Sequence, residues 1–228
     1  MPDARHPLDR PVWGSLAGAW RAKAVQAGEA LRLEPAYGPF AASVSLTPDS
    51  LADLAVFQLG EDSLDLIEPE PIPAPAGLAI TLQTKLVQMT ADASAGEPPD
   101  VRAVALDESD GPEMLALAQL TRPGPFAPRT PALGGFIGVK VDGRLIAMAG
   151  ERMRVRGFCE VSGVCTHPEH RGRGHAGALM RLVARRILAR GETPFLHAME
   201  TNAGAIALYG KLGFRIRRKL VLTVLKRA

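Results

Sequence analysis

The segment from Val164 to Ala176 has the residue types and spacing best suited to binding chemistry. It reads VCTHPEHRGRGHA, a short apolar run followed by a basic turn and the start of a long amphipathic pattern. Gly172 and Gly174 remove side chains that would keep an anion away from the backbone. The first turn of a helix adds unpaired N–H groups and the positive end of the helix dipole. The segment therefore predicts a phosphate-binding loop between a strand and a helix.

The glycine spacing helps to choose among phosphate loops. A Walker loop needs Gly-Lys-Ser or Gly-Lys-Thr, which this segment lacks. Gly177 formally completes G-x-G-x-x-G, but the loop lies late in the chain. Glu192 and Glu200 only straddle the position expected for an acidic ribose partner. We therefore do not favour a dinucleotide-binding fold.

Two motifs resemble the GCN5-related N-acetyltransferases, the GNAT superfamily. Arg171-x-x-Gly174-x-Ala176 is similar to the R/Q-x-x-G-x-G/A signature of that superfamily. The segment 202–214, NAGAIALYGKLGF, is similar to its N-x-x-A-x-x-L-Y-x-K-L-G-F segment. The surrounding sequence looks most like the FR47-like branch. The resemblance covers the chain from about residue 101 onward and implies an α/β (α+β) fold, with a mixed twisted sheet flanked by helices.

The resemblance also implies acetyl-coenzyme A as the cofactor, with its pantetheine arm between the strand before the loop and the next strand. The backbone of the first strand would pair with the arm, and the loop would hold the pyrophosphate. The implied cofactor-binding residues are Val164, Cys165, Thr166, Arg171, Gly172, Arg173, Gly174, His175, Ala176, Asn202, Ala205 and Tyr209. We expect no metal in this site.

Two residues match catalytic roles. Acyl transfer to a lysine-like amine needs a base, because such an amine is mostly protonated at neutral pH. Glu160 begins the strand before the loop, where several GNAT enzymes place a glutamate base; its alternative is a surface ion pair. Tyr209 matches the tyrosine that protonates the departing thiolate in this family; its alternative is a packing residue. Cys165 is not needed as a nucleophile, since the resemblance implies direct attack by the amine.

The expected function is an acetyl-coenzyme A-dependent N-acyltransferase that acts on a primary amine of a small molecule, amino acid or peptide. The alternative is a catalytically decayed acyl-coenzyme A sensor, against which the presence of Tyr209 argues. The loop 122–131 and the N-terminal half would select the acceptor, but neither carries a motif that identifies it. The acyl chain length and the choice between monomer and homodimer are also left open.

Composition sets broad limits on these hypotheses. Of the 228 residues, 46% are hydrophobic and 22% charged, as in ordinary globular proteins. Arginines concentrate between 152 and 227, which suits a polyanionic cofactor, but aromatics are only 5%, so we expect no nucleic acid partner. No apolar run reaches about 20 residues, and no signal-peptide pattern opens the chain, so we expect no membrane contact. We infer a cytoplasmic protein whose Cys159 and Cys165 are buried, reduced thiols.

The pattern predicts two parts, an N-terminal α/β half of unknown role (1–95) and a GNAT domain (96–228), joined by a linker at 91–100. Similar element types in the first part hint at a degenerate second copy of the fold. The elements expected in the first part are a helix at 12–33, a strand at 40–46, a helix from 48 capped by Asp49 or Ser50, and strands at 64–67 and 78–89. Those expected in the second are strands at 101–106, 136–141, 144–150, 160–166, 195–199 and 217–225, and helices from 111, at 176–190 and after Asn202.

Overall fold

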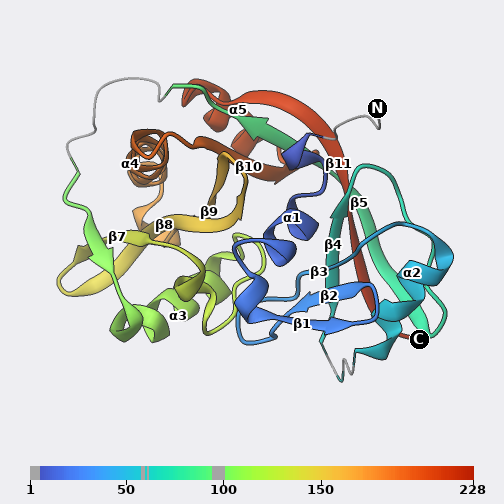
Figure 1. Ribbon diagram of the computed structural model, residues 1–228. Helices are drawn as coiled ribbons and strands as arrows, with labels where there is room; N and C mark the ends of the chain where they lie inside the picture. The colour runs from blue at the N-terminus through green and yellow to red at the C-terminus, as the bar shows by residue number, and fades with distance from the viewer. Residues whose placement is uncertain (1–5, 58–59, 61, 94–100) are drawn as a thin grey trace.

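The computed structural model describes residues 6–57, 60, 62–93 and 101–228 (Figure 1). Within these residues the chain forms one eight-stranded mixed sheet, a separate three-stranded sheet and five α-helices. The expected boundary at 95/96 and most of the expected linker lie outside the described residues. An α+β fold with a mixed sheet flanked by helices is confirmed.

The helices and strands are labelled in chain order. They are α1 (Pro11–Ala17), β1 (Ala24–Ala27), β2 (Ala30–Leu33), β3 (Ala41–Ser43), α2 (Pro48–Ala52), β4 (Leu64–Glu68), β5 (Leu78–Thr90), β6 (Val104–Leu106), α3 (Gly111–Thr121), β7 (Phe136–Val141), β8 (Arg144–Val155), β9 (Phe158–Thr166), α4 (His175–Ala189), β10 (Thr193–Met199), α5 (Ala203–Lys211) and β11 (Arg215–Arg227).

The large sheet draws strands from both predicted parts of the chain. Its order is β4-β11-β5-β10-β9-β8-β7-β6, and only β9 and β10 are parallel neighbours. Strand β5 lies between β10 and β11 and pairs with both (Figure 1). Two strands of the N-terminal segment, β4 and β5, are therefore hydrogen-bonded into the sheet that carries the GNAT-like motifs.

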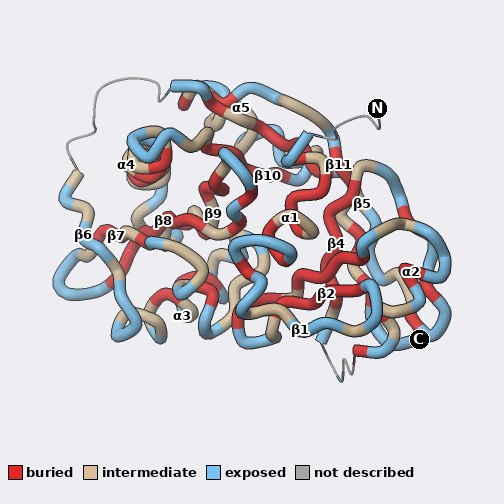
Figure 2. The backbone as a smooth tube through the Cα atoms, in the orientation of Figure 1, coloured by how far each residue is buried: buried red, intermediate tan, exposed pale blue. Residues whose placement is uncertain are grey.

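Helices cover both faces of this sheet. Ala147 and Ala149 of β8 belong to the apolar cluster that α4 buries, whereas Met148 belongs to the cluster of α3. Because successive side chains of a strand point to opposite faces, α4 and α3 lie on opposite sides. Figure 2 shows the buried backbone running through the middle of the sheet between them. Both helices thus flank the point where β9 ends.

Helix α1 and the residues around Trp20 and Phe40 pack on the sheet. Helix α1 contacts β8 and β4, and its Val12 and Leu16 are fully buried. Trp20 and Phe40 pack against each other, with ring centroids 5.7 Å apart. They share one apolar cluster with Leu86 of β5 and with residues of β10 and β11. Burial of large aromatic and aliphatic side chains is the main source of stability here.

Several predicted elements differ from the structure. The helix expected at 12–33 is wrong beyond Ala17, because the chain turns at Gly18 and then forms the hairpin of β1 and β2 around Gly28, whose φ is +53°. The cap of α2 is Thr47, whose hydroxyl accepts from the Ser50 N–H, and not Asp49 or Ser50. Strand β6 is limited to Val104–Leu106. The order of the elements from residue 101 onward is confirmed.

The Asp142-Gly143 hairpin is also confirmed. Both residues have positive φ, at 50° and 79°, as a tight two-residue turn between β7 and β8 requires. Gly143 accepts this conformation without strain.

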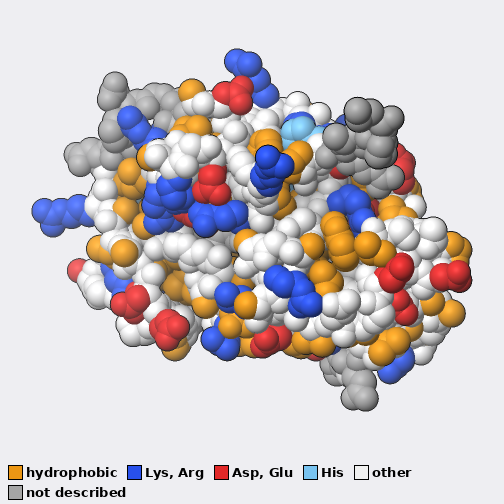
Figure 3. Space-filling model, in the orientation of Figure 1, with side chains coloured by type: hydrophobic (Ala, Val, Ile, Leu, Met, Phe, Trp, Pro, Cys, Tyr) orange, Lys and Arg blue, Asp and Glu red, His pale blue; other side chains and the backbone are white. Residues whose placement is uncertain are grey.

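Arg186 of α4 and Arg190, which follows its last residue, take part in an ion-pair network away from the loop. Arg186 and Arg190 donate to Glu151 at 2.9 and 2.7 Å, and Arg154 and Arg190 also pair with Glu192. Figure 3 shows basic and acidic side chains side by side over α4 and the neighbouring strands. The basic excess of this segment is therefore partly neutralised by its own carboxylates.

Candidate active site

Strands β9 and β10 diverge after a short paired stretch. Their parallel pairing runs from Phe158↔Thr193 to Glu160↔Phe195 and then stops. Beyond it, β9 continues to Thr166 against β8, while β10 continues to Met199 against β5. The two strands therefore enclose a wedge whose edges carry backbone N–H and C=O groups without a partner strand between them.

The basic turn lies at the open end of this wedge. Gly172 and Gly174 have φ of 76° and 81°, and a Cβ at either position would meet no atom within 4 Å. Gly174 is the N-cap of α4, and no side chain caps the helix. The first N–H groups of this 15-residue helix therefore have no side-chain cap, which is the arrangement that an anion site at this position would need.

A cleft of about 1070 Å³ includes the wedge and the loop and extends to a region lined by Phe40 and by residues of β4 and β5. Most of the sequence-predicted cofactor residues line it. Those lining residues are Val164, Cys165, Thr166, Arg171, Gly172, Gly174, His175, Ala176, Asn202, Ala205 and Tyr209. Arg173 is exposed and is not among the residues that line the cleft. The two distant motifs therefore converge on one cavity.

Two buried polar atoms on the cleft wall lack partners among the described residues. They are Thr166 Oγ1 at the end of β9 and His170 Nδ1 in the turn that follows. Buried polar groups are normally hydrogen-bonded, so both atoms have capacity for a bond to a ligand or to water in the cleft. The amides of a pantetheine arm, which both donate and accept, and the acceptor oxygens of a pyrophosphate fit this lining.

The second motif forms α5 on the other side of the wedge. Asn202 caps the helix, since its side-chain oxygen accepts from the Ala205 N–H at 3.1 Å. Tyr209 is partly buried against Phe214, with ring centroids 6.4 Å apart. Burial raises the pKa of Tyr209, so its phenol is protonated at neutral pH. No hydrogen bond holds this phenol among the described residues, which leaves it available to the cleft.

Glu160 lies at the vertex of the wedge, behind the cleft wall. It is 1% exposed, and its carboxylate accepts from Arg152 Nε at 2.9 Å, from Arg152 Nη2 at 3.1 Å and from His197 Nδ1 at 2.9 Å. Burial acts to raise the pKa of Glu160, but the charge of Arg152 and the hydrogen bond from His197 outweigh it and lower the pKa to about 2. Arg152 and His197 line the cleft, whereas Glu160 does not.

Hydrogen bonds fix the tautomer of His197. Gln88 donates to the Leu8 carbonyl at 2.9 Å and accepts from Arg217 at 2.8 Å, so its remaining N–H faces His197 Nε2 at 3.1 Å. Nε2 is therefore the unprotonated nitrogen, and Nδ1 donates to Glu160. Both ring nitrogens are engaged, which keeps this imidazole in place.

Comparison with known proteins agrees with this geometry. The model of the family described as FR47-like protein matches residues 137–222. A crystal structure from Novosphingobium aromaticivorans, described as an acetyltransferase of the GNAT family, is 50% identical, with a TM-score of 0.89 over 98% of this chain and 99% of that one. The chain belongs to the GNAT family of acetyltransferases. No curated protein matches it.

More distant GNAT structures share the fold over nearly the whole chain. A GCN5-related N-acetyltransferase from Kribbella flavida has a TM-score of 0.64 at 21% identity, and each chain is covered to 93%. A related protein from Streptococcus suis has a TM-score of 0.61 at 15% identity, over 99% of this chain and 95% of that one. The N-terminal segment is thus part of what these structures share. No helix among the described residues is long and apolar enough to span a membrane.

The cysteines of this GNAT protein behave as the sequence predicts. Both are free and buried. Burial raises the pKa of Cys165 to about 11 and that of Cys159 to about 12, so both are thiols at neutral pH. Since the thiolate is the nucleophilic form, Cys165 is an inert part of the cleft wall.

Sequence reasoning missed the other end of the GNAT cleft. That end is lined by Phe40, Asp65, Ile67, Leu86, Arg152, His197 and Leu222, which come from six different strands or loops. Strand pairing is the only signal that brings them together, and no local motif encodes it. Hydrophobic alternation in β4 and β5 indicates buried strands, but it does not reveal their partners.

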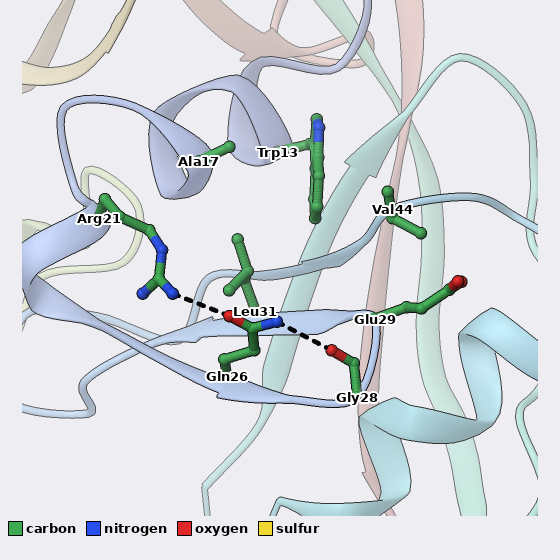
Figure 4. A pocket seen from close by; sticks show the side chains of 8 residues that line it. All are labelled: Trp13, Ala17, Arg21, Gln26, Gly28, Glu29, Leu31 and Val44. Atoms are coloured by element: carbon green, nitrogen blue, oxygen red, sulfur yellow. Dashed lines mark hydrogen bonds between the residues drawn. The ribbon is translucent and has the colours of Figure 1, made fainter.

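A second, smaller hollow of about 350 Å³ lies between α1 and the β1–β2 hairpin (Figure 4). Arg21 donates to Gln26 at 2.8 Å, and Gln26 donates to the Gly28 carbonyl at 3.0 Å. Trp13 and Leu31 supply apolar walls. The amide of Gln26 is thus satisfied within the hollow, and we assign no ligand to it.

Proposed function

We propose that this GNAT protein transfers the acetyl group of acetyl-coenzyme A to a primary amine of a small molecule, amino acid or peptide by direct attack. The observation that carries the proposal is the wedge between β9 and β10, which opens at its wide end onto the glycine turn and the uncapped start of α4. The two orphaned polar atoms at Thr166 and His170 support a ligand in this position.

The cofactor would be held mainly by backbone groups. Val164 and Thr166 would pair with the pantetheine arm as an added strand, which makes binding insensitive to most side chains on β9. The turn at Gly172 and Gly174, with Arg171, would take the pyrophosphate. When bound, acetyl-coenzyme A supplies a thioester carbonyl that an unprotonated amine can attack.

Tyr209 would donate the proton that the departing sulfur needs. Tyr209 lines the cleft, and its phenol is protonated at neutral pH and has no competing partner among the described residues. General acids of this kind typically contribute about 10²–10⁴-fold to the rate. An intact donor at this position favours catalysis over the sensor alternative.

Glu160 takes a different part in the proposal from the one its sequence position suggests. A carboxylate with a pKa of about 2 is a weak proton acceptor at neutral pH, and all its hydrogen-bonding capacity is used. We therefore propose that Glu160 positions Arg152 and His197 on the cleft wall. The proton of the amine would pass to solvent water at the open mouth of the cleft, beside the loop that begins at the exposed Arg122.

A free-thiol assay with acetyl-coenzyme A and a panel of primary amines tests this function. Release of one thiol for each acetylated amine, confirmed by mass spectrometry of the product, is the expected result. In parallel, acetyl-coenzyme A should raise the melting temperature. Cofactor binding without thiol release for any amine would instead identify a sensor.

A further inference from the structure

The acceptor end of the cleft contains one buried carboxylate with few partners. Asp65 is 6% exposed, and among the described residues that line the cleft it is the only Asp or Glu. Within that part of the chain its single hydrogen-bond donor is the Ser63 hydroxyl, at 3.0 Å, and no cation lies within salt-bridge distance. A buried charge is normally paired, so this carboxylate has capacity for a positively charged group.

The neighbouring cation is already neutralised. Arg152 lies with its guanidinium carbon 4.8 Å from the centre of the Phe40 ring and forms a two-bond pair with Glu160. It acts on Asp65 only as a more distant charge, which lowers the pKa of Asp65 less than burial raises it. Arg152 therefore does not meet the need of Asp65 for a partner.

The walls around Asp65 are apolar. Asp65 and Ile67 lie on the same face of β4, because they are two residues apart. Ile67 pairs with Leu222 of β11, and Phe40 forms a backbone bridge to Asp65. Leu86 closes the cleft from β5. A ligand here would bury an apolar body against these side chains and place its charge at Asp65.

We propose that Asp65 binds the positive charge of the acceptor, and that the acceptor is a primary amine on an apolar body. This inference rests on the proposed function, because it identifies the acceptor of that same cleft. The N-terminal segment would then select the substrate, since β4, β5 and the Phe40 segment form this end. An acceptor with a carboxylate in this position would be repelled by Asp65.

Two probes of similar shape and different charge test the proposal. Benzylamine is protonated near neutral pH, whereas benzyl alcohol is neutral, and calorimetric titration in saturating coenzyme A measures the binding of each. The wild-type protein should bind benzylamine at least about tenfold more tightly, as expected for one charge-assisted hydrogen bond. Methylamine, which lacks the apolar body, should bind more weakly than benzylamine.

Asp65→Asn should abolish the preference for benzylamine, while the matched control Asp142→Asn should keep it. Asp142 lies in the exposed β7–β8 turn, where Asn tolerates the positive φ of 50°. Asp65→Ser serves as a second variant of the same carboxylate. A preference that survives both Asp65 substitutions would overturn the proposal, as would equal binding of the two probes to the wild type. Equal affinity for methylamine and benzylamine would contradict the inference that the acceptor has an apolar body.

The outcome is separable from that of the proposed function. Binding needs no turnover, so thiol release could fail for every amine while the preference for benzylamine still depends on Asp65. Conversely, if amines are acetylated but the preference for benzylamine over benzyl alcohol is unchanged in the Asp65 variants, the proposed function stands and this acceptor site is rejected.

Discussion

The proposed cofactor end of the cleft is built from sequence neighbours, and the proposed acceptor end from strands far apart in the chain. The loop at Gly172–Gly174 and the wedge both arise within β9, α4 and β10. The acceptor end needs Phe40, Asp65 and Leu222, which only the pairing of β4 with β11 brings together. Backbone geometry therefore defines the first end, and side chains define the second. Related proteins can therefore keep the backbone of the first end and change the side chains of the second.

Glu160 lies at the vertex of the wedge, between the two ends of the cleft. Its substitution should have the largest effect on stability. Glu160→Gln leaves Arg152 and His197 with a neutral partner, and breaking a buried pair typically costs about 3–5 kcal/mol. The folded pKa of Glu160 is depressed, so its stabilisation is present above pH 4.5 and is lost as pH falls through about 2. Urea denaturation across this range should show the deficit shrinking in acid.

The partly exposed carboxylate Glu200, which pairs with the exposed Lys219, gives the control for this variant. Glu200→Gln should change stability little, because solvent screens an exposed ion pair. In kinetics, the deficit of Glu160→Gln should not vary with pH if Glu160 only positions its neighbours. A deficit that disappears at high pH would restore it as the base.

Sequence reasoning succeeded where one segment determines its own structure. The turn at Asp142-Gly143, the strand–loop–helix around Gly174 and the cap at Asn202 are all local, and each lies where the pattern predicts. It failed between Gly18 and Leu33, where an alanine-rich stretch with helical spacing forms a hairpin. There, pairing with β3 and packing against α1 override the local helix propensity.

The site residues divide in the same way. Tyr209 could be assigned because a motif carries it. Asp65 could not, since an aspartate in a strand flanked by leucines has no signature until its neighbours in space are known. For Glu160 the alternative of an ion pair with an arginine is confirmed, but the pair with Arg152 is buried and not on the surface, and the bond to His197 was not foreseen; these two partners set its pKa.

Loss of the phenol of Tyr209 should act on the cofactor end alone. Tyr209→Phe should lower kcat by about 10²–10⁴-fold, because a proton donor is lost while the ring still packs on Phe214. The cofactor Kd from calorimetry should stay within a few-fold. Tyr37→Phe, at the other tyrosine of the chain, should retain activity. Full turnover by Tyr209→Phe would make this residue a packing group.

A bulky side chain in the glycine turn should remove cofactor binding. Acetyl-coenzyme A at a hundredfold excess over Kd should add about 2.7 kcal/mol to the stability of the wild type. Gly174→Trp combined with Arg171→Ala should abolish the resulting rise in Tm. Gly191→Trp is the control, since Gly191 also has positive φ and open space around it. A rise that persists in the double variant would place the cofactor elsewhere.

The smallest effect should come from Asp65, and it should be a gain. Burial raises the pKa of Asp65 to about 6, so the native state binds its proton more tightly than the unfolded chain does. Its charge therefore costs stability above pH 6, and the cost disappears as pH falls toward the ordinary aspartate pKa of 3.8. Asp65→Asn should raise stability by about 1–2 kcal/mol above pH 6 and by little in acid.

Other charged groups near Asp65 also contribute to the pH dependence of stability. Arg152 from β8 is the cation that acts on it, and His197 from β10 and Arg122 from the loop after α3 line the same cleft. These groups are present in both the wild type and Asp65→Asn. The difference between the two unfolding free energies at each pH therefore reports on Asp65 alone. A curve for Asp65→Asn that runs parallel to the wild type at all pH values would mean that Asp65 is already paired in the native state.

The central place of β5 also constrains how the protein folds. Both hydrogen-bonding edges of β5 are paired to strands more than 100 residues later, β10 and β11. During synthesis, β5 leaves the ribosome long before β10 or β11. Both of its edges therefore remain unpaired until those strands are made. Such long-range closure predicts slow folding and an early intermediate that is prone to aggregate. Yield on expression should therefore depend more on temperature and chaperones than the final stability suggests.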